Sequence, residues 1–255
     1  FRATSFAAPV ETPAVVGHTL FNVTPGMPIG VTAAPRVMSL SRGPDQGVMV
    51  LGAERNLVAP VLLACVRSAM QSRPDARVVV LDGMSTSGYK EPVVAAVRSL
   101  LAEHGVSTRY VSREAVAAVL SELQSAEAPE VSTLVLGLGL DGMVELERED
   151  PETYVAPVEH LRGLVRTGGL RDIAVIGWWQ SRGRAEAQLS YDLPGIRGMI
   201  FCAVGAEDIR HLVGAGARLP EGYPRVLCYD RSSPRGAELL VPFAVPESLG
   251  EVLRG

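Results

Sequence analysis

Residues 52–59 lie where a nucleotide-binding loop belongs, between an apolar β-type run at 47–51 and an apolar helical pattern. A loop that binds nucleotide phosphates reads G-x-x-x-x-G-K-[ST]. Its backbone N–H groups and lysine hold the phosphates, and its hydroxyl holds magnesium. The segment here, which we call the relic loop, consists of Gly52, Ala53, Glu54, Arg55, Asn56, Leu57, Val58 and Ala59. It keeps the first glycine, but leucine, valine and alanine replace the second glycine, the lysine and the hydroxyl residue.

The elements that position this loop follow a regular order. From about residue 27, apolar β-type runs alternate with helical patterns, which predicts an α/β fold with a mostly parallel central sheet and helices on both faces. The expected strands are 47–52, 77–82, 108–111, 133–136, 173–179, 199–203, 225–229 and 239–243. The expected helices are about 60–72, 91–104, 113–125 and 152–166, with Pro60 in the first turn of the first helix.

Composition sets the frame for these elements. The chain has 255 residues, of which 47% are hydrophobic, enough for one large domain at 27–255. The stretch 1–26 is rich in proline and small residues and is interpreted as a linker or N-terminal extension. We expect the chain to be part of a longer polypeptide or the product of processing. No apolar run approaches the roughly 20 residues that span a bilayer, so we expect a cytoplasmic domain. If the domain lies at the inner face of a membrane, we expect other parts of the parent protein to hold it there.

The charged residues and the cysteines argue against a general nucleic-acid surface, a phosphate-binding lysine in the relic loop and a metal site. The formal net charge is −4 and the pI is about 5.7, so the chain has no overall basic field for nucleic acid. The one lysine, Lys90, lies too far along the chain to serve the relic loop. Three cysteines, at 65, 202 and 228, lack metal-ligand spacing. We therefore expect buried, reduced thiols and no metal site.

With these elements in order, the chain resembles the motor domain of the FtsK/SpoIIIE (HerA–FtsK) family of P-loop translocases from residue 27 to 245. The segments that carry the resemblance are 27–31, 37–40, 47–53, 198–210, 219–227 and 241–246. The family's loop begins with the same Gly-Ala pair, and Leu219-Pro220-Glu221-Gly222 is similar to its L-P-x-G hairpin. The resemblance implies a RecA-like P-loop NTPase fold with a C-terminal β-hairpin.

The same resemblance marks two further losses and one retention. The family's second catalytic strand ends in an Asp-Glu pair that positions magnesium and water, but the strand at 133–136 continues into Gly137 and Leu138. A shift of register would make Asp141 the magnesium ligand, whereas Gly139 and Gly142 around it favour a turn and cap. Gln180 stands at the place of the family's polar sensor; a polar residue at a strand end is the alternative. Trp178 and Trp179 beside it predict core or a subunit contact.

Two arginines are candidates for action on a neighbouring subunit. Arg162 and Arg166 lie four apart on one expected helical face, at about the family position of an arginine finger. A solvated arginine face is the alternative interpretation. Within the relic loop, Arg55 is expected to pair with Glu54 or another nearby carboxylate and so close the phosphate site. Asp82 ends a strand at the carboxyl edge of the sheet, where ligands bind in open α/β folds; with Gly83 after it, a turn residue is expected, and a ligand contact is the alternative.

The retained fold and the lost site together predict a catalytically inactive, or pseudo-ATPase, domain with no cofactor. The resemblance extends to the degenerate motor domains of type VII secretion ATPases, which implies a structural, regulatory or partner-docking module of a larger translocase or secretion machine. Its partners would be other ATPase domains or subunits, in an oligomer or a multidomain chain, with protein or DNA cargo. One alternative is a domain that binds or weakly hydrolyses Mg-ATP through an atypical site. Another is a nucleic-acid-binding component of a DNA translocase.

Overall fold

A ten-stranded sheet runs through the described part of the chain. The computed structural model describes residues 19–25, 36–39, 46–86, 88–127, 131–151, 153–215, 226–232 and 237–241. The strands are β1 (Thr19–Pro25), β2 (Arg36–Ser39), β3 (Gly47–Leu51), β4 (Arg77–Asp82), β5 (Thr108–Val111), β6 (Thr133–Leu138), β7 (Ile173–Trp179), β8 (Ile196–Cys202), β9 (Val226–Asp230) and β10 (Ala237–Val241). Their spatial order is β2-β1-β10-β9-β8-β3-β7-β6-β4-β5.

Six neighbouring strands, from β8 to β5 in this order, pair in parallel. The remaining four, β9, β10, β1 and β2, add to the β8 side in antiparallel pairs. Strands β9 and β10, which correspond to the two expected C-terminal strands, pair antiparallel with each other. Because the central strands are parallel, the loops that follow β3, β4, β6 and β7 emerge at one carboxyl edge of the sheet, where ligands bind in open α/β folds.

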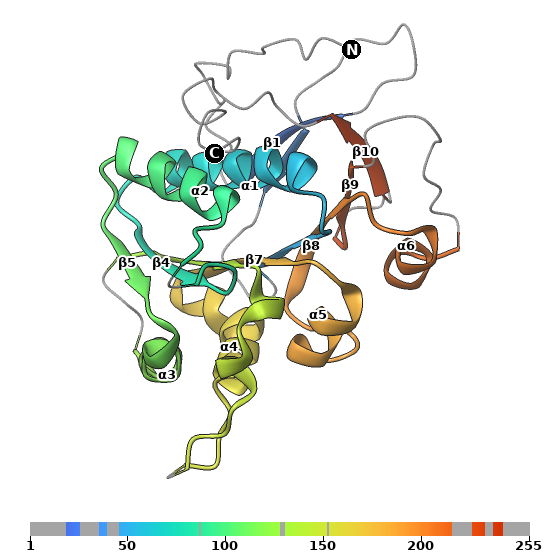
Figure 1. Cartoon of the computed structure of the whole chain (residues 1–255). Helices are drawn as coiled ribbons and strands as arrows, with labels where there is room; N and C mark the ends of the chain where they lie inside the picture. The colour runs from blue at the N-terminus through green and yellow to red at the C-terminus, as the bar shows by residue number, and fades with distance from the viewer. Residues whose placement is uncertain are drawn as a thin grey trace, which may run out of the picture.

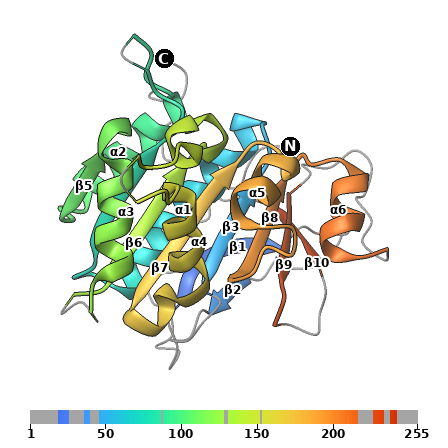
Figure 2. The ribbon, with the colours of Figure 1, turned by 90° about the horizontal axis from the view of Figure 1, so that it is seen from below.

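Helices cover both faces, as the sequence predicts (Figures 1 and 2). The helices are α1 (Arg55–Ser72), α2 (Pro92–Glu103), α3 (Val116–Ser125), α4 (Pro157–Thr167), α5 (Arg182–Leu189) and α6 (Ala206–Val213). On one face, α1 and α2 pack on alternate strand residues such as Val48 and Val80. On the other face, α3, α4 and α5 pack on the intervening residues, such as Met49 and Val79.

The continuous apolar runs explain this arrangement. A strand that is buried on both faces must be apolar at every position, not at alternate ones. All five residues of β3, all six of β6 and all seven of β7 are buried. Trp178 and Trp179 are both fully buried, so the double tryptophan is core.

Several elements differ from expectation. Strand β1 lies within the 1–26 stretch and pairs with β10 and β2, so the sheet includes residues on both sides of the expected boundary. Helix α4 begins at Pro157 and not near residue 152, because proline with its fixed φ and missing N–H favours the first helical position. Helix α5, which was not expected, follows β7 and is capped by the Ser181 hydroxyl.

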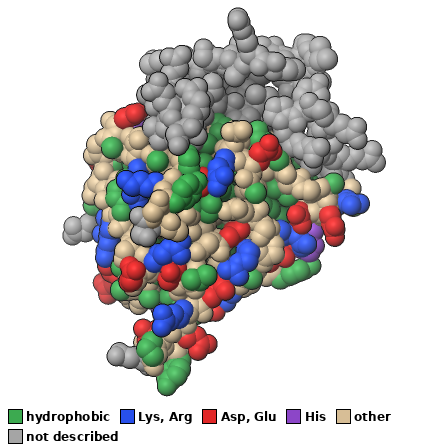
Figure 3. Space-filling model, in the orientation of Figure 1, with side chains coloured by type: hydrophobic (Ala, Val, Ile, Leu, Met, Phe, Trp, Pro, Cys, Tyr) green, Lys and Arg blue, Asp and Glu red, His purple; other side chains and the backbone are tan. Residues whose placement is uncertain are grey.

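One segment projects from the body between β6 and α4 (Figure 1). We call residues 144–151 and 153–156 the arm. Elsewhere on the same side of the molecule, acidic and basic side chains are interspersed (Figure 3). Among the described residues, no helix is both long enough and apolar enough to cross a bilayer.

Candidate functional site

The relic loop connects β3 to α1 at the carboxyl edge, and its glycine is fixed by neighbouring strands. Gly52 has φ +142°, and a Cβ placed there would approach the Cys202 carbonyl oxygen to 2.0 Å. Its N–H donates to the Trp179 carbonyl at 2.9 Å, and its own carbonyl accepts the Trp178 indole N–H at 2.9 Å. Both main-chain groups of Gly52 are therefore bound to β7 instead of facing an open loop.

Helix α1 starts inside the relic loop. It begins at Arg55, and the Glu54 carbonyl accepts the N–H groups of Leu57 and Val58 at 2.9 and 3.0 Å. The expectation that Pro60 lies in the first turn is therefore wrong: proline is the sixth residue of the helix and leaves one carbonyl without its usual partner. Burial of the apolar face of α1 outweighs that loss. The chain between strand and helix is reduced to Gly52, Ala53 and Glu54.

The side chains at the motif positions point into the core. Leu57 packs against the cluster beneath α1, and Val58 and Ala59 are 0% and 1% exposed. Ala53, Glu54, Arg55 and Asn56 are exposed. At the positions of the lysine and hydroxyl residue, the chain thus has buried apolar groups that neither bind phosphate nor hold a metal.

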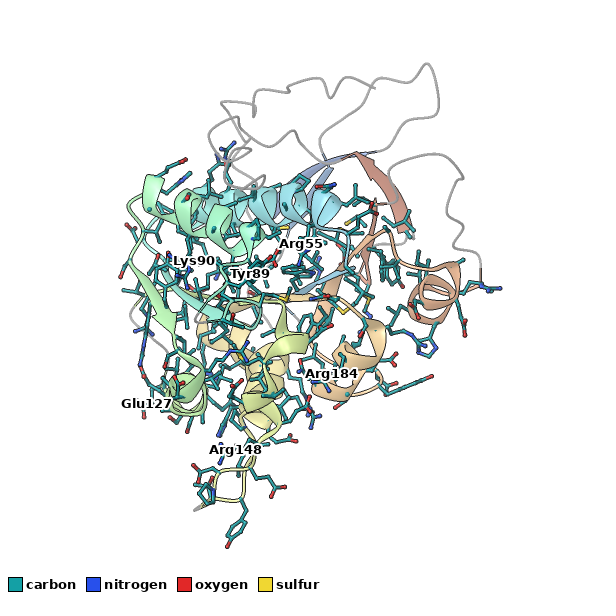
Figure 4. The ribbon with its side chains drawn as sticks, viewed as in Figure 1. Arg55, Tyr89, Lys90, Glu127, Arg148 and Arg184 are labelled. Atoms are coloured by element: carbon teal, nitrogen blue, oxygen red, sulfur yellow. The ribbon has the colours of Figure 1, made fainter. Side chains whose placement is uncertain are left out.

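Arg55 pairs with Glu91, not with Glu54. The Arg55 Nε lies 2.6 Å from Glu91 Oε1, and Nη2 donates to Oε2 at 3.0 Å. The Tyr89 hydroxyl donates to the same Oε2 at 3.2 Å. The Glu91 side chain is 0% exposed and Arg55 is 53% exposed, and the bond to Glu91 raises the pKa of the Arg55 guanidinium. Figure 4 shows Arg55 near Tyr89 and Lys90 on this edge.

Glu91 is the residue of this site that sequence reasoning missed. It is the N-cap residue of α2, directly before Pro92, so the ion pair joins the N-termini of α1 and α2. The Glu91 carboxylate accepts one guanidinium N–H and one phenol O–H, and it lies in ion-pair contact with the Arg55 Nε. Guanidinium groups bind carboxylates and phosphates alike, so the Arg55 side chain is already occupied by an anionic group of the chain. In the sequence, Glu91 before Pro92 at the start of a helix is the feature that could indicate a carboxylate at the same sheet edge. However, 36 residues separate Glu91 from Arg55, so the sequence alone does not pair them.

The end of β6 also lacks the catalytic carboxylates. Gly137 and Leu138 are buried strand residues, and a Cβ on Gly137 would meet the Leu140 side chain at 2.6 Å. Asp141 accepts the backbone N–H of Gln180 at 2.9 and 3.0 Å and that of Ser181 at 3.1 Å. Burial raises the pKa of Asp141, although these bonds oppose the shift. The carboxylate thus caps the end of β7, in agreement with the turn-and-cap interpretation.

Gln180 and Asp82 make local contacts at the same edge. The half-buried Gln180 side chain donates from Nε2 to the Met84 sulfur at 3.0 Å. Asp82 accepts the N–H groups of Met84 and Ser85 at 3.1 and 2.9 Å, so it is a turn residue as predicted. These polar groups hold adjoining loops together, with Met84 between them.

The two candidate arginines differ sharply. Arg162 donates from Nε to the Gln188 carbonyl and from Nη2 to the Ala187 carbonyl, both at 2.7 Å, so it ties α4 to the last turn of α5. Arg166 is exposed. Since α4 leads into the start of β7, Arg166 lies near the amino edge of the sheet, opposite the relic loop. Any action of Arg166 on a nucleotide would have to be on a neighbouring subunit.

No metal-type cluster adds to this site. Within the described ranges, no group of three or more His, Cys, Asp or Glu side chains has a metal-binding arrangement. Cys65, Cys202 and Cys228 are buried thiols outside any disulfide, as expected, and burial raises the pKa of Cys65 and Cys202. The family-like segment 219–222 lies outside the described residues.

Solved structures with the same arrangement of strands and helices are ATPase domains. EssC (ATPases 2 and 3) from Geobacillus thermodenitrificans matches 95% of this chain and 49% of its own, with a TM-score of 0.64 and 14% identity. The cytoplasmic domain of the Thermomonospora curvata type VII secretion ATPase EccC matches 95% of this chain and 28% of its own, with a TM-score of 0.60 and 13% identity.

The pCW3 conjugation coupling protein TcpA, in its monomer form with ATPγS, covers 92% of this chain and 71% of its own, with a TM-score of 0.57 and 12% identity. The chain has the RecA-like P-loop ATPase fold. It spans about half of the EssC structure and less than a third of the EccC structure. No protein-family model matches the sequence, and no curated protein matches it.

Proposed function

We propose that this chain is a catalytically inactive ATPase-fold domain that serves as a structural, regulatory or partner-docking module of a larger translocase or secretion machine. The fold is that of secretion and conjugation ATPases. The chemistry of the fold depends on positioning and on charge stabilisation by lysine, metal and water-orienting carboxylates. All of these groups are replaced at their expected positions.

The observation that carries this proposal is the Arg55–Glu91 ion pair. It holds the side chain of Arg55, the first residue of α1, against a carboxylate of the chain itself, with two guanidinium nitrogens at 2.6 and 3.0 Å from the Glu91 oxygens. A nucleotide phosphate would have to displace a fully buried carboxylate and approach the exposed Glu54 carboxylate. Both steps oppose binding of an anion.

The backbone supports the same conclusion. Phosphate loops bind through a concave run of free N–H groups. Here the Gly52 N–H is bonded to β7, and Leu57 and Val58 bond within the first turn of α1. We infer that no nucleotide or magnesium is needed for this domain to fold or to act.

Other ATPase domains are the proposed partners. The matched EssC structure contains two ATPases, and this chain corresponds to about half of it. A domain without its own turnover then acts by contact with an active neighbour. We propose Arg166, and not the structurally engaged Arg162, as the residue available to reach that neighbour's nucleotide. If Arg166→Ala left the ATPase rate of an assembled active partner unchanged, this role would be excluded.

Nucleic acid is a less suitable partner. Phosphate backbones bind clustered Lys and Arg side chains, whereas acidic and basic groups are interspersed over the face shown in Figure 3. The arm, which projects farthest in Figure 1, carries Glu145, Glu147, Glu149 and Asp150 against a single Arg148. These charges favour a protein partner.

Steady-state phosphate release tests the proposal. The purified chain with Mg-ATP should release phosphate no faster than buffer, while an ATPase with an intact loop does so under the same conditions. Turnover that increases in proportion to the concentration of the chain and survives repurification would overturn it. Such turnover would favour the atypical nucleotide site instead.

A further inference from the structure

The arm is a pre-formed projection. At its base, Met143 and Leu146 are fully buried. Arg113 donates to the carbonyls of Gly142 and Gly83 at 3.1 and 2.9 Å, which ties the arm to the turn after β4. Arg184 lies 2.7 Å from Glu147 and ties the other side to α5. A segment anchored in this way loses little conformational freedom when it binds a partner.

The outer part of the arm closes on itself. The Asp150 N–H donates to the Val155 carbonyl at 3.2 Å, and the Tyr154 N–H donates back to the Asp150 carbonyl at 2.8 Å. The Asp150 Oδ1 accepts the Thr153 N–H at 2.9 Å. The arm therefore ends in a bonded turn that fixes where its side chains point.

This turn holds an aromatic ring in solvent. Tyr154 is 78% exposed and has φ +55°, a left-handed conformation that is unfavourable for a bulky residue. Tyr191 is also exposed, at 65%, but its ring packs edge-on against His211 at 5.1 Å between centroids. Tyr154 has no such ring partner among the described residues, and a rigid exposed tyrosine is a common anchor of protein interfaces.

The charges on the arm select the partner. Of its described acidic groups, Glu145 and Glu147 pair with Arg113 and Arg184 of the body. On the outer part, the exposed Glu149 lies between the exposed Arg148 and the acidic Asp150, so two acidic groups stand beside one basic group. The carboxylates and the tyrosine ring of the outer arm complement a basic surface, because guanidinium groups bind both carboxylates and the faces of aromatic rings.

We propose that the arm docks, with Tyr154 as its anchor, onto an arginine- or lysine-bearing surface of another protein domain. The inference deepens the docking role proposed above and rests on it for the origin of the partner, but it is tested without nucleotide. Tyr154 supplies the contact area and the cation–π attraction, and Glu149 supplies charge attraction. The same charges repel nucleic acid and anionic lipid.

Fluorine NMR of the chain labelled with 3-fluorotyrosine tests the arm directly. The chain contains six tyrosines, and Tyr154→Phe identifies the resonance of interest. The probes are a short synthetic peptide of alternating arginine and serine and its glutamate counterpart. The arginine peptide should shift the Tyr154 resonance, and the glutamate peptide should not.

Variants then distinguish binding of the arginine peptide at the arm from nonspecific attraction of a basic peptide to an acidic protein. Tyr154→Ala and Glu149→Arg should each weaken binding of the arginine peptide by roughly five-fold, and Tyr191→Ala should leave it unchanged. Equal affinity in all three variants, or an unshifted Tyr154 resonance, would overturn the proposal. A larger Tyr154 shift with single-stranded DNA or anionic vesicles would also overturn it. None of these outcomes depends on whether the chain hydrolyses ATP.

Discussion

The relic loop and the arm both follow strands of the parallel sheet, yet they use their polar groups in opposite ways. At the relic loop, charges and main-chain groups bind each other: Arg55 pairs with Glu91, and Gly52 bonds to both tryptophans of β7. On the arm, Tyr154 and Glu149 face solvent. A catalytic edge needs unpaired donors that wait for substrate, whereas a docking domain needs outward contacts on a closed body. This distribution of polar groups fits the docking role that we propose.

Removal of Arg55 should produce the largest effect at the closed edge. Arg55→Ala leaves the Glu91 carboxylate buried with the Tyr89 hydroxyl as its remaining side-chain donor, so we expect a loss of about 2 kcal/mol in the free energy of unfolding. This value is below that of a fully buried pair because Arg55 is half exposed. Chemical denaturation measures it.

Glu91→Gln sharpens the same point. Glutamine keeps the volume and an acceptor for Arg55 but removes the buried charge, so its cost should be smaller than that of Arg55→Ala. Lys90→Ala, at the neighbouring exposed cation, is the control and should change stability by less than about 0.5 kcal/mol. A greater loss for Glu91→Gln than for Arg55→Ala would mean that the ion pair is not what closes the edge.

The tryptophans give an intermediate effect. Trp178→Phe removes the indole donor to Gly52, and leaving that buried carbonyl unpaired should cost about 1 to 2 kcal/mol. Trp179→Phe is matched in size and burial but loses its bond to Gln188 instead. Amide hydrogen exchange should therefore quicken at the start of α1 in the first variant and in α5 in the second. The reverse pattern would contradict the role of Trp178 in fixing the relic loop.

The arm should give the smallest effect, with the opposite sign. Asparagine tolerates the left-handed conformation better than tyrosine, and the exposed ring buries little area. Tyr154→Asn should therefore stabilise the chain by about 0.5 to 1 kcal/mol while it weakens docking. Thermal unfolding measures the gain, with Tyr191→Asn as a control expected to be neutral or slightly destabilising. A destabilised Tyr154→Asn would show that the ring supports the fold.

The sequence predicts the sheet well because its central strands are buried on both faces. Continuous apolar runs such as 173–179 are typical of central strands in an α/β fold, and β7 has those bounds. Local sequence predicts the start of α1 too late because Pro60 favours a first helical turn, whereas the partly buried Leu57 and the buried Val58 and Ala59 belong to the same helix. Local sequence does not predict strand β1, because its pairing with β10 joins segments that lie far apart along the chain.

The closure of the site depends on contacts that local sequence does not specify. The absence of loop lysine was evident at Val58, and a carboxylate partner for Arg55 was expected. Its identity was not, because Glu91 lies in a separate strand-to-helix connection. Likewise, Arg162 and Arg166 lie four residues apart on the same face of one helix, so the sequence does not distinguish their roles. The packing of α5 on α4 does, because Arg162 donates to two carbonyls of α5.

Calorimetric titration of the unmodified chain with Mg-ATP is the most direct test of whether the nucleotide site is closed by the chain itself. With Arg55 held by Glu91 and Gly52 bonded to β7, the titration should show no saturable heat beyond dilution. Saturable binding with a low-micromolar dissociation constant, lost in Arg55→Ala, would show that the relic loop still binds a nucleotide. That result would contradict the claim that the chain itself closes the site.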